Sequence, residues 1–286
     1  MRILASIVLI ASIGGFALAQ APQAQRPRRA GMQLSCQAWT FRELTVLDTI
    51  DTVNSLGIRN VEFFPGQKLS KDNPIGFDHN ASPEVIAEVK ARLQAKQVRA
   101  VAYGVVGLGE NEEENRKVFE FAKTMGIGVI NSEPPEAALS MIGKLCREYN
   151  IKVGIHNHPK PSHYWSPETV LKAVDGIDSF VGACADTGHW YRSGINPVDA
   201  LKQLKGRITS LHFKDLNTEK EDVPFGTGAG DVKAQLQELV AQGFRGPISI
   251  EYERTSGAEL LENVRKCVQW YRATMREIRP AVRPRP

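Results

Sequence analysis

The chain has 286 residues, of which 36 are basic and 32 acidic, giving a net charge of +4. Seven of the positive charges are arginines in the two terminal segments, so the body between them carries about −3. Enzymes that act on nucleic acids usually carry a basic patch on the folded domain, so this balance argues against a nucleic-acid partner. The four cysteines lie among apolar residues without C-x-x-C spacing and are predicted to be buried free thiols.

Both ends of the chain differ in composition from the body. Residues 1–19 combine one arginine, a short apolar run and an A-L-A ending, which is typical of a secretory signal peptide cleaved after Ala19. We therefore expect an exported protein, periplasmic or secreted, that is not held in the membrane after cleavage; an uncleaved anchor is the alternative. Residues 20–32 and 279–286 are rich in proline and arginine and are predicted to be a disordered linker and a disordered tail.

Strand-like runs alternate with helix-like segments over residues 33–278. The predicted strands are 34–38, 58–64, 98–104, 127–132, 152–156, 181–185, 208–213 and 247–251, and a long helix is predicted over 256–278. Helix starts are marked by Ser82-Pro83 and Ser166-Pro167, and helix ends by Gly57, Gly126 and Asn150. Eight such units predict a single-domain α/β fold, the (β/α)₈ TIM barrel. A doubly wound open sheet is the alternative, but no G-x-G-x-x-G follows the first strand.

Polar side chains stand where the later strands end. Alternate residues of a barrel strand face the interior, and barrel enzymes carry their chemistry at the carboxyl ends of the strands. The side chains that this alternation places inward at strands five to eight are His156 and His158, Cys184 and Asp186, Ser210, His212 and Lys214, and Ser249, Glu251 and Glu253. The fourth strand runs directly into Glu133. These groups should converge on one rim of the barrel.

Convergence of several carboxylates predicts a bound cation, because like charges in one small space repel and shift each other's pKa values. The predicted metal ligands are Glu133, His156, Asp186, His212 and Glu251. Mixed imidazole and carboxylate ligands favour Mn²⁺, with Zn²⁺, Co²⁺ or Fe²⁺ as alternatives and Mg²⁺ less well suited. His189, three residues after Asp186, is predicted to bind a substrate hydroxyl or carry a proton; capping of the following segment is the alternative.

The runs D-T-G-H at 186–189, H-F-K-D at 212–215 and I-E at 250–251 resemble the xylose isomerase-like TIM barrel superfamily, and the resemblance covers about residues 33–275. This group includes sugar isomerases and epimerases, inosose dehydratases and endonuclease-four type DNA repair enzymes. The epimerase branch holds its metal with glutamate, aspartate, histidine and glutamate on strands five to eight. Asp186, His212 and Glu251 match the last three, whereas His156 replaces the glutamate. That replacement looks more like the inosose dehydratase branch, and Glu133 could supply the missing carboxylate.

The resemblance and the predicted ligands imply abstraction of a proton next to a carbonyl, with the metal stabilising the enediolate. The predicted activity is a sugar isomerase or epimerase; the alternative is a lyase or dehydratase acting on a keto-sugar, keto-inositol or 3-keto-glycoside. Glu133 and Glu251 are the proton-transfer candidates, with His158 and His189 as carriers or substrate ligands. Lys214 is expected to stabilise negative charge that develops on the substrate, unless it is a surface lysine.

Other functions are less well supported by the sequence. The loop 224–231, PFGTGAGD, stands where barrels often bind phosphate, but it lacks a basic residue, which favours a small unphosphorylated carbohydrate as substrate. DNA repair is disfavoured because Glu62 and Tyr103 stand at the ends of strands two and three, where the repair enzymes have histidines. A non-catalytic sugar-binding barrel is disfavoured by the full set of metal ligands. A homo-oligomer is left open.

Overall fold

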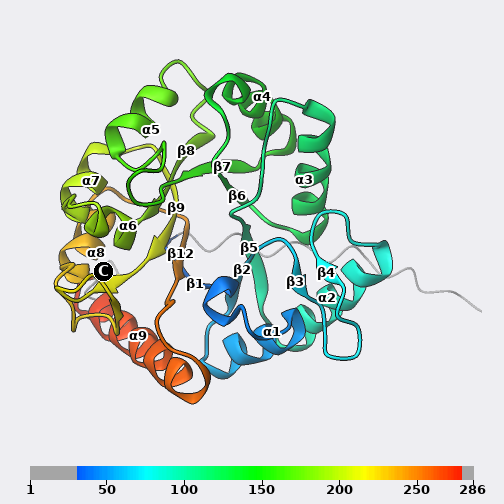
Figure 1. The fold of residues 1–286 in the computed structure, drawn as a ribbon, viewed down its shortest axis with the longest axis horizontal. Coiled ribbons are helices and arrows are strands. Elements are labelled where there is room, and N and C mark those ends of the chain that lie inside the picture. The colour runs from blue at the N-terminus through cyan, green and yellow to red at the C-terminus, as the bar shows by residue number, and fades with distance from the viewer. Residues whose placement is uncertain (1–30, 279–286) are drawn as a thin grey trace, which may run out of the picture. The chain divides into compact units, whose positions relative to one another are not determined.

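The computed structural model describes residues 31–278, and eight parallel strands in it close into a barrel (Figure 1). The strands follow one another around the barrel in the order β1-β12-β9-β8-β7-β6-β5-β2. Their bounds are β1 Gln33–Gln37, β2 Asn60–Phe63, β5 Arg99–Tyr103, β6 Val129–Ser132, β7 Lys152–His156, β8 Val181–Asp186, β9 Ile208–Phe213 and β12 Pro247–Ile250. The first strand pairs with both β2 and β12, so the sheet has no free edge. The predicted TIM barrel is therefore confirmed, and the open sheet is ruled out.

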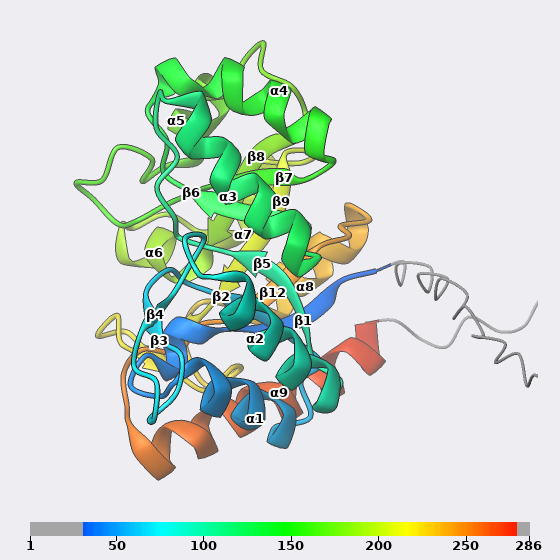
Figure 2. The same ribbon diagram turned by 90° about the vertical axis from the view of Figure 1, so that its right-hand side faces the viewer.

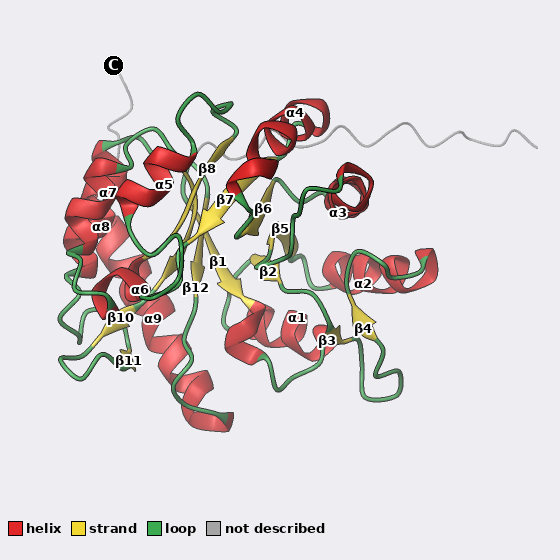
Figure 3. Ribbon diagram, turned by 45° about the horizontal axis from the view of Figure 1, so that its top comes forward, coloured by secondary structure: helices red, strands yellow, loops and turns green. Residues whose placement is uncertain are grey.

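Helices surround the strands on the outside of the barrel (Figures 1 and 3). Their bounds are α1 Val46–Ser55, α2 Pro83–Ala95, α3 Glu112–Met125, α4 Leu139–Tyr149, α5 Pro167–Ala173, α6 Thr187–Arg192, α7 Pro197–Gln203, α8 Val232–Ala241 and α9 Gly257–Ile278. Two short 3₁₀ helices, Ala38–Phe41 and Glu136–Ala138, follow β1 and β6. The long helix expected at the end of the barrel is α9.

The helix boundaries follow the local signals in the sequence. Ser82 and Ser166 each accept a backbone N–H at the start of α2 and α5, and a proline stands in the first turn of each helix. Gly126 and Asn150 end α3 and α4 in the left-handed conformation, with φ of 72° and 53°. This conformation reverses the chain at once, so that β6 and β7 begin within a few residues.

Two antiparallel strand pairs lie outside the barrel and were not predicted. β3 (Gln67–Lys68) pairs with β4 (Gly76–Phe77) in the connection from β2 to α2. β10 (Asp215–Leu216) pairs with β11 (Asp222–Val223) in the connection from β9 to α8. Both pairs are too short to show an alternating apolar pattern. The second pair follows the H-F-K-D run directly, and thereby fixes the chain that leaves the site.

Figure 2 shows helices such as α2 and α3 packed over the strands, and residues of both layers form the hydrophobic core. Leu211 and Phe213, on the outward face of β9, are fully buried in it. Polar side chains such as Ser210, His212 and Ser249 occupy the opposite face of their strands and are equally buried. All four cysteines are buried and free, as predicted. The barrel therefore has an apolar outer layer and a polar interior, which is where the candidate site lies.

Several sequence predictions lie outside the described residues. They are the signal peptide over 1–19, the linker over residues 20–30 and the tail over 279–286. Within residues 31–278, none of the helices has both the length and the apolar character needed to cross a bilayer.

Candidate metal centre and active site

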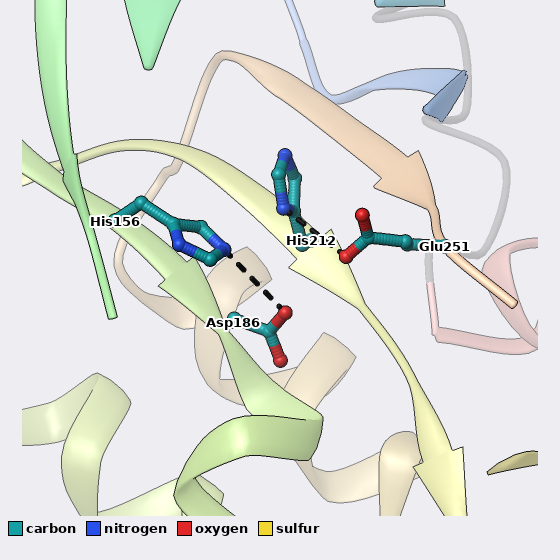
Figure 4. Close-up of side chains that lie close together, drawn as sticks. All are labelled: His156, Asp186, His212 and Glu251. Atoms are coloured by element: carbon teal, nitrogen blue, oxygen red, sulfur yellow. Dashed lines mark ion pairs between the residues drawn. The ribbon is translucent and has the colours of Figure 1, made fainter. Parts of the chain in front are cut away.

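Four side chains from four strands meet at one end of the barrel (Figure 4). His156 ends β7, Asp186 ends β8, His212 lies near the end of β9, and Glu251 follows β12. One ligand atom from each lies within 4.8 Å of the others, and all four residues are buried. The pairs β7·β8, β8·β9 and β9·β12 are neighbours in the barrel, so the four groups come from adjacent strands. The sequence predicted this convergence from strand alternation.

The two ring nitrogens of His156 face different carboxylates. Nδ1 lies 3.3 Å from Glu133 Oε1, whereas Nε2 lies 3.6 Å from Asp186 Oδ2. An ionised carboxylate can only accept, so the Nδ1 hydrogen bond places the ring proton on Nδ1. The lone pair of Nε2 is then on the side of Asp186, within the group of four. Proteins orient metal-binding histidines in this way, with a carboxylate behind the ring.

His212 has the same arrangement, with a carboxylate that the sequence analysis did not assign to the site. Its Nε2 donates to Glu62 Oε1 at 2.9 Å, and its Nδ1 lies 3.2 Å from Glu251 Oε2. Glu62 is fully buried and also accepts hydrogen bonds from Ser249 Oγ and Asn131 Nδ2, each at 2.6 Å. These donors offset the cost of burying the Glu62 charge. Both histidines therefore present one bare nitrogen to the same space.

The donor set fits a divalent cation. His156 Nε2 and His212 Nδ1 are buried and lack a hydrogen-bond partner, and the buried Asp186 Oδ2 has an ion pair with the Lys214 ammonium at 3.1 Å. Buried polar atoms are normally paired, and an imidazole lone pair facing a carboxylate oxygen is unfavourable without a positive charge between them. Two imidazoles and two carboxylates suit Mn²⁺, Zn²⁺, Co²⁺ or Fe²⁺. This buried cluster could therefore bind a metal ion.

The charges of the cluster shift the pKa values of its members. Burial alone would raise the pKa of Glu251, but the nearby charge of Lys214 holds it well below its usual range. Burial also acts to raise the pKa of Glu133, and hydrogen bonds from His156 and His158 instead lower it to about 2. Both carboxylates are therefore ionised at neutral pH. In this resting arrangement neither is ready to take up a proton, so proton uptake by either requires substrate to alter these contacts.

Glu133 lies next to the cluster but outside the group of four. Its Oε1 contacts Nδ1 of both His156 and His158, and its Oε2 accepts from Ser162 Oγ at 3.3 Å. His158 lies beyond the end of β7, and its side chain is half exposed. Glu133 therefore connects a solvent-accessible imidazole to a predicted ligand, an arrangement suited to moving a proton between pocket and solvent.

Asp186 is held in place by its neighbours. Asn157 donates from Nδ2 to the backbone carbonyl of Asp186 at 2.9 Å and accepts the Asp186 N–H at 2.8 Å. The Asp186 carboxylate also caps α6, because its Oδ1 accepts the N–H of His189 at 2.7 Å. The residue that caps this helix is thus Asp186 rather than His189. One oxygen of Asp186 is used in the cap, and the other, Oδ2, faces the cluster.

His189 lies in the first turns of α6, directly after β8. Arg192 Nη1 lies 3.1 Å from His189 Nδ1. Because a guanidinium can only donate, the proton of a neutral His189 must sit on Nε2. Burial, together with the charge of Lys214, lowers the pKa of His189 to about 3 despite the opposing charge of Asp186. His189 is therefore a neutral imidazole in the pocket wall, and its protonated Nε2 lies 3.5 Å from Asp186 Oδ2.

A pocket of about 400 Å³ opens above the cluster. Its polar lining includes His156, His158, His189, Glu251 and Glu253, and its apolar lining includes Trp39, Phe64 and Val105. Among the described residues, the lining contains no lysine or arginine. This volume lies within the range of small-molecule sites. A small ligand in the pocket would contact both an apolar wall and the histidines.

The glycine-rich loop 224–231 does not offer its backbone to a phosphate. The buried carboxylate of Asp215 accepts the N–H groups of Gly226, Gly228 and Gly230 at 2.8, 3.0 and 3.2 Å. A Cβ at Gly228 would lie 2.4 Å from Asp215 Oδ1, so only glycine permits this approach. The H-F-K-D aspartate thus occupies the donors that a phosphate would need.

The structure places the predicted site residues in four positions. His156, Asp186, His212 and Glu251 form the cluster, and His158 and His189 lie in the pocket wall. Glu133 lies behind His156, and Lys214 is fully buried among carboxylates instead of lining the pocket. Glu62, Asn131, Asn157 and Glu253 were not assigned a role by the sequence analysis. The available signal was Glu62 itself, a carboxylate between the apolar residues Val61 and Phe63 of the second strand.

We expect Glu62→Gln to weaken Mn²⁺ binding by roughly 10- to 100-fold, the usual effect of altering the partner of a metal-binding histidine. The amide keeps the shape of the side chain but loses the charge that holds the His212 proton on Nε2. Titration calorimetry measures the affinity, and circular dichroism checks the fold. Ser249→Ala removes one hydrogen bond to Glu62 but leaves the Glu62 charge in place, so this variant should bind Mn²⁺ nearly as well as the wild type. Unchanged affinity in Glu62→Gln would contradict the role assigned to it.

Similarity to known proteins extends over most of the chain. An inosose dehydratase from Mesomycoplasma hyopneumoniae is 28% identical over 157 residues, which are 47% of this chain and 52% of that protein. The chain spans about half the length of the curated relatives that it matches. A solved but uncharacterised protein from Parabacteroides distasonis is 34% identical, with a TM-score of 0.69 over 85% of this chain and 98% of that one.

The fold is shared with enzymes of named activity. A D-psicose 3-epimerase crystallised with D-fructose superposes with a TM-score of 0.70 over 85% of this chain and 99% of its own, at 12% identity. The sequence profile described as xylose isomerase-like TIM barrel matches residues 50–274. Members of this group include epimerases and dehydratases, which are enzymes acting on small molecules. With the barrel, the matched range and the cluster at the strand ends together, the chain belongs to the xylose isomerase-like TIM barrel family.

Proposed function

We propose that this protein is a divalent-metal-dependent sugar isomerase or epimerase that removes a proton next to the carbonyl of an uncharged carbohydrate. The observation that carries the proposal is the buried group of four, in which His156 Nε2 and His212 Nδ1 lack a hydrogen-bond partner and one ligand atom from each of the four residues lies within 4.8 Å of the others. A bound divalent ion, with Mn²⁺ favoured, would act as a Lewis acid toward the oxygens of the substrate. The remaining work falls to the side chains around the pocket.

The pocket residues have distinct tasks in this proposal. Glu251 lines the pocket as an ionised carboxylate and is the first candidate to accept the proton. His189 donates from Nε2 to a substrate hydroxyl, because Arg192 occupies its Nδ1. Glu133 and His158 form the second proton-transfer pair, which returns a proton to the neighbouring carbon or to the opposite face. Return to the neighbouring carbon gives an isomerase, and return to the opposite face gives an epimerase.

An uncharged substrate is supported by two features of the pocket. The cations nearest to it are already paired, since Lys214 contacts three carboxylates and Arg192 contacts Asp222 and Glu253. The backbone donors of the loop 224–231 are taken up by Asp215. A phosphate or carboxylate on the substrate would have no free partner among these groups, whereas hydroxyl groups can bind to histidine and glutamate.

Elimination is the second candidate reaction. His156 stands where the resemblance gives epimerases one of their two proton-transfer glutamates, so Glu251 is the one glutamate of that pair in the cluster. The relatives named inosose dehydratase also favour this alternative. In that case, after Glu251 takes the proton, His158 or His189 would protonate a departing hydroxyl or glycosyl oxygen on the β carbon. The substrate would be a keto-sugar, a keto-inositol or a 3-keto-glycoside.

Incubation in D₂O distinguishes these reactions. Mn²⁺-loaded protein is mixed with uncharged ketoses, keto-inositols and 3-keto-glycosides, and the products are followed by NMR. Deuterium next to the carbonyl together with a rearranged sugar indicates an isomerase or epimerase, and release of water or an alcohol indicates a lyase. Protein treated with a chelator is the control and should be inactive. Absence of both exchange and release with every substrate class would contradict the proposal.

A further inference from the structure

Lys214 holds its ammonium group against three carboxylates inside the barrel. Its Nζ lies 3.1 Å from Asp186 Oδ2, 2.8 Å from Glu251 Oε2 and 2.9 Å from Glu253 Oε2. The Lys214 side chain is completely buried, as is that of Asp186. A buried lysine is stable only when it is paired, and here the partners are three acidic groups.

The three carboxylates differ in their relation to the cluster. Asp186 and Glu251 belong to the group of four predicted metal ligands, whereas Glu253 does not. Glu253 is held separately: its Oε1 accepts from the indole N–H of Trp39 at 3.1 Å, and its backbone N–H donates to Asp222. Lys214 therefore shares Asp186 and Glu251 with the predicted cation, whereas it shares Glu253 with Arg192, whose Nη1 lies 3.8 Å from the same Oε2.

We propose that the Lys214 ammonium competes with the metal for the carboxylates of Asp186 and Glu251. When the metal binds, the ammonium moves toward Glu253. The inference rests on the metal centre of the proposed function. A unit charge that touches the same oxygens as a divalent ion repels it, and the repulsion is strong because both charges are shielded from water. Lys214 thus weakens metal binding, but in the metal-free site it offsets part of the negative charge of its three carboxylate partners.

The alternative for Lys214 is direct contact with the substrate, as the sequence predicted. Its position argues against that use, because the ammonium faces carboxylates and is not part of the pocket lining. A simple structural role is the other alternative. It makes a different prediction, since loss of any member of a structural network should damage the site and weaken metal binding.

Two variants give opposite results under the proposal. Lys214→Met keeps the volume and removes the charge, and should bind Mn²⁺ at least about tenfold more tightly. Glu253→Gln leaves Lys214 with only Asp186 and Glu251, and should bind Mn²⁺ at least about threefold more weakly. The glutamine keeps an acceptor for Trp39. Titration calorimetry on purified, chelator-treated protein gives both affinities. Lys220→Met, at an exposed lysine in the same β9–α8 connection, is the matched control and should match the wild type.

Metal-free stability gives a second readout. Without the ammonium, Asp186, Glu251 and Glu253 repel one another, so the Tm of metal-free Lys214→Met should fall by about 5 °C. Saturating Mn²⁺ should then raise the Tm of this variant by more than it raises that of the wild type. In the double variant, Glu253→Gln should no longer weaken metal binding, because its effect acts through Lys214.

The results separate this inference from the proposed function. If no variant and no wild-type protein binds a divalent metal, the metal centre itself is wrong. If the wild type binds Mn²⁺ but Lys214→Met binds it equally or more weakly, the competition proposed for Lys214 is wrong. Should Lys214→Met not fold, Glu253→Gln decides the matter: weaker binding at unchanged Tm supports the competition, and unchanged affinity overturns it.

Discussion

His212→Ala should lose bound metal and catalytic activity together, with activity falling at least about 10³-fold, equivalent to roughly 4 kcal/mol of transition-state stabilisation. The imidazole is one of two neutral ligands in the cluster, and its removal leaves Glu62 without the donor that faces it. The cavity and the lost hydrogen bond to Glu62, which Ser249 and Asn131 still contact, should together lower the free energy of unfolding by about 3 kcal/mol, which a large barrel can tolerate.

Three measurements check this result. Metal content after dialysis reports the ligand role, the rate of deuterium exchange reports activity, and circular dichroism reports the fold. Cys184→Ser, which alters a buried side chain of the neighbouring strand β8 without removing a predicted ligand, serves as the control for disturbance of the barrel interior. A folded His212→Ala protein that retains a full equivalent of metal would show that His212 is not a ligand.

His156→Glu should separate metal binding from catalysis. A carboxylate at this position can bind the same ion, so we expect metal affinity to change by less than about tenfold. Activity on the native substrate should fall at least about 100-fold, because the new charge lies beside Glu133 and removes the Nδ1 donor that helps to hold the Glu133 pKa near 2. Calorimetry and steady-state rates on the same preparation measure the two effects.

His158→Ala is the matched control for His156→Glu. The His158 side chain is half exposed and contacts Glu133 rather than the group of four, so this variant should keep its metal. Its activity should fall, since a pocket imidazole linked to Glu133 is lost. Loss of metal from His158→Ala but not from His156→Ala would mean that the two histidines have exchanged roles. The orientation of the β7 end would then differ from the one described here.

The sequence was sufficient to predict the fold and the four clustered side chains. Strand alternation alone placed His212 and Asp186 on the inner face, and the position of the strand ends then brought His156 and Glu251 beside them. Helix boundaries followed from serine caps and from residues with positive φ such as Gly126. These features depend only on neighbours along the chain or on the repeat of one strand, so a single sequence specifies them.

Contacts across the barrel interior could not be predicted in the same way. Glu62 meets His212 across 150 positions of sequence, and that meeting depends on barrel radius and on the register of β2 and β9. The position of Glu133 depends on the path of the chain after β6, where two prolines follow it. The burial of Lys214 required the carboxylate of Glu253, which lies beyond the end of β12. Strand periodicity carries no information on any of these three.

The closing of the barrel by its last strand has a consequence for biogenesis. His156, Asp186 and His212 leave the ribosome in order on three neighbouring strands, but Glu251 arrives only with β12, which must insert between β9 and the first strand, β1. The set of four metal donors in a nascent chain is therefore incomplete until β12 pairs with β1. A metal ion bound once β12 is in place would stabilise the closed barrel, since any later release of β12 must also detach Glu251 from the ion. At a free metal concentration of 100 times Kd, metal binding would raise the free energy needed to detach β12 by about 2.7 kcal/mol.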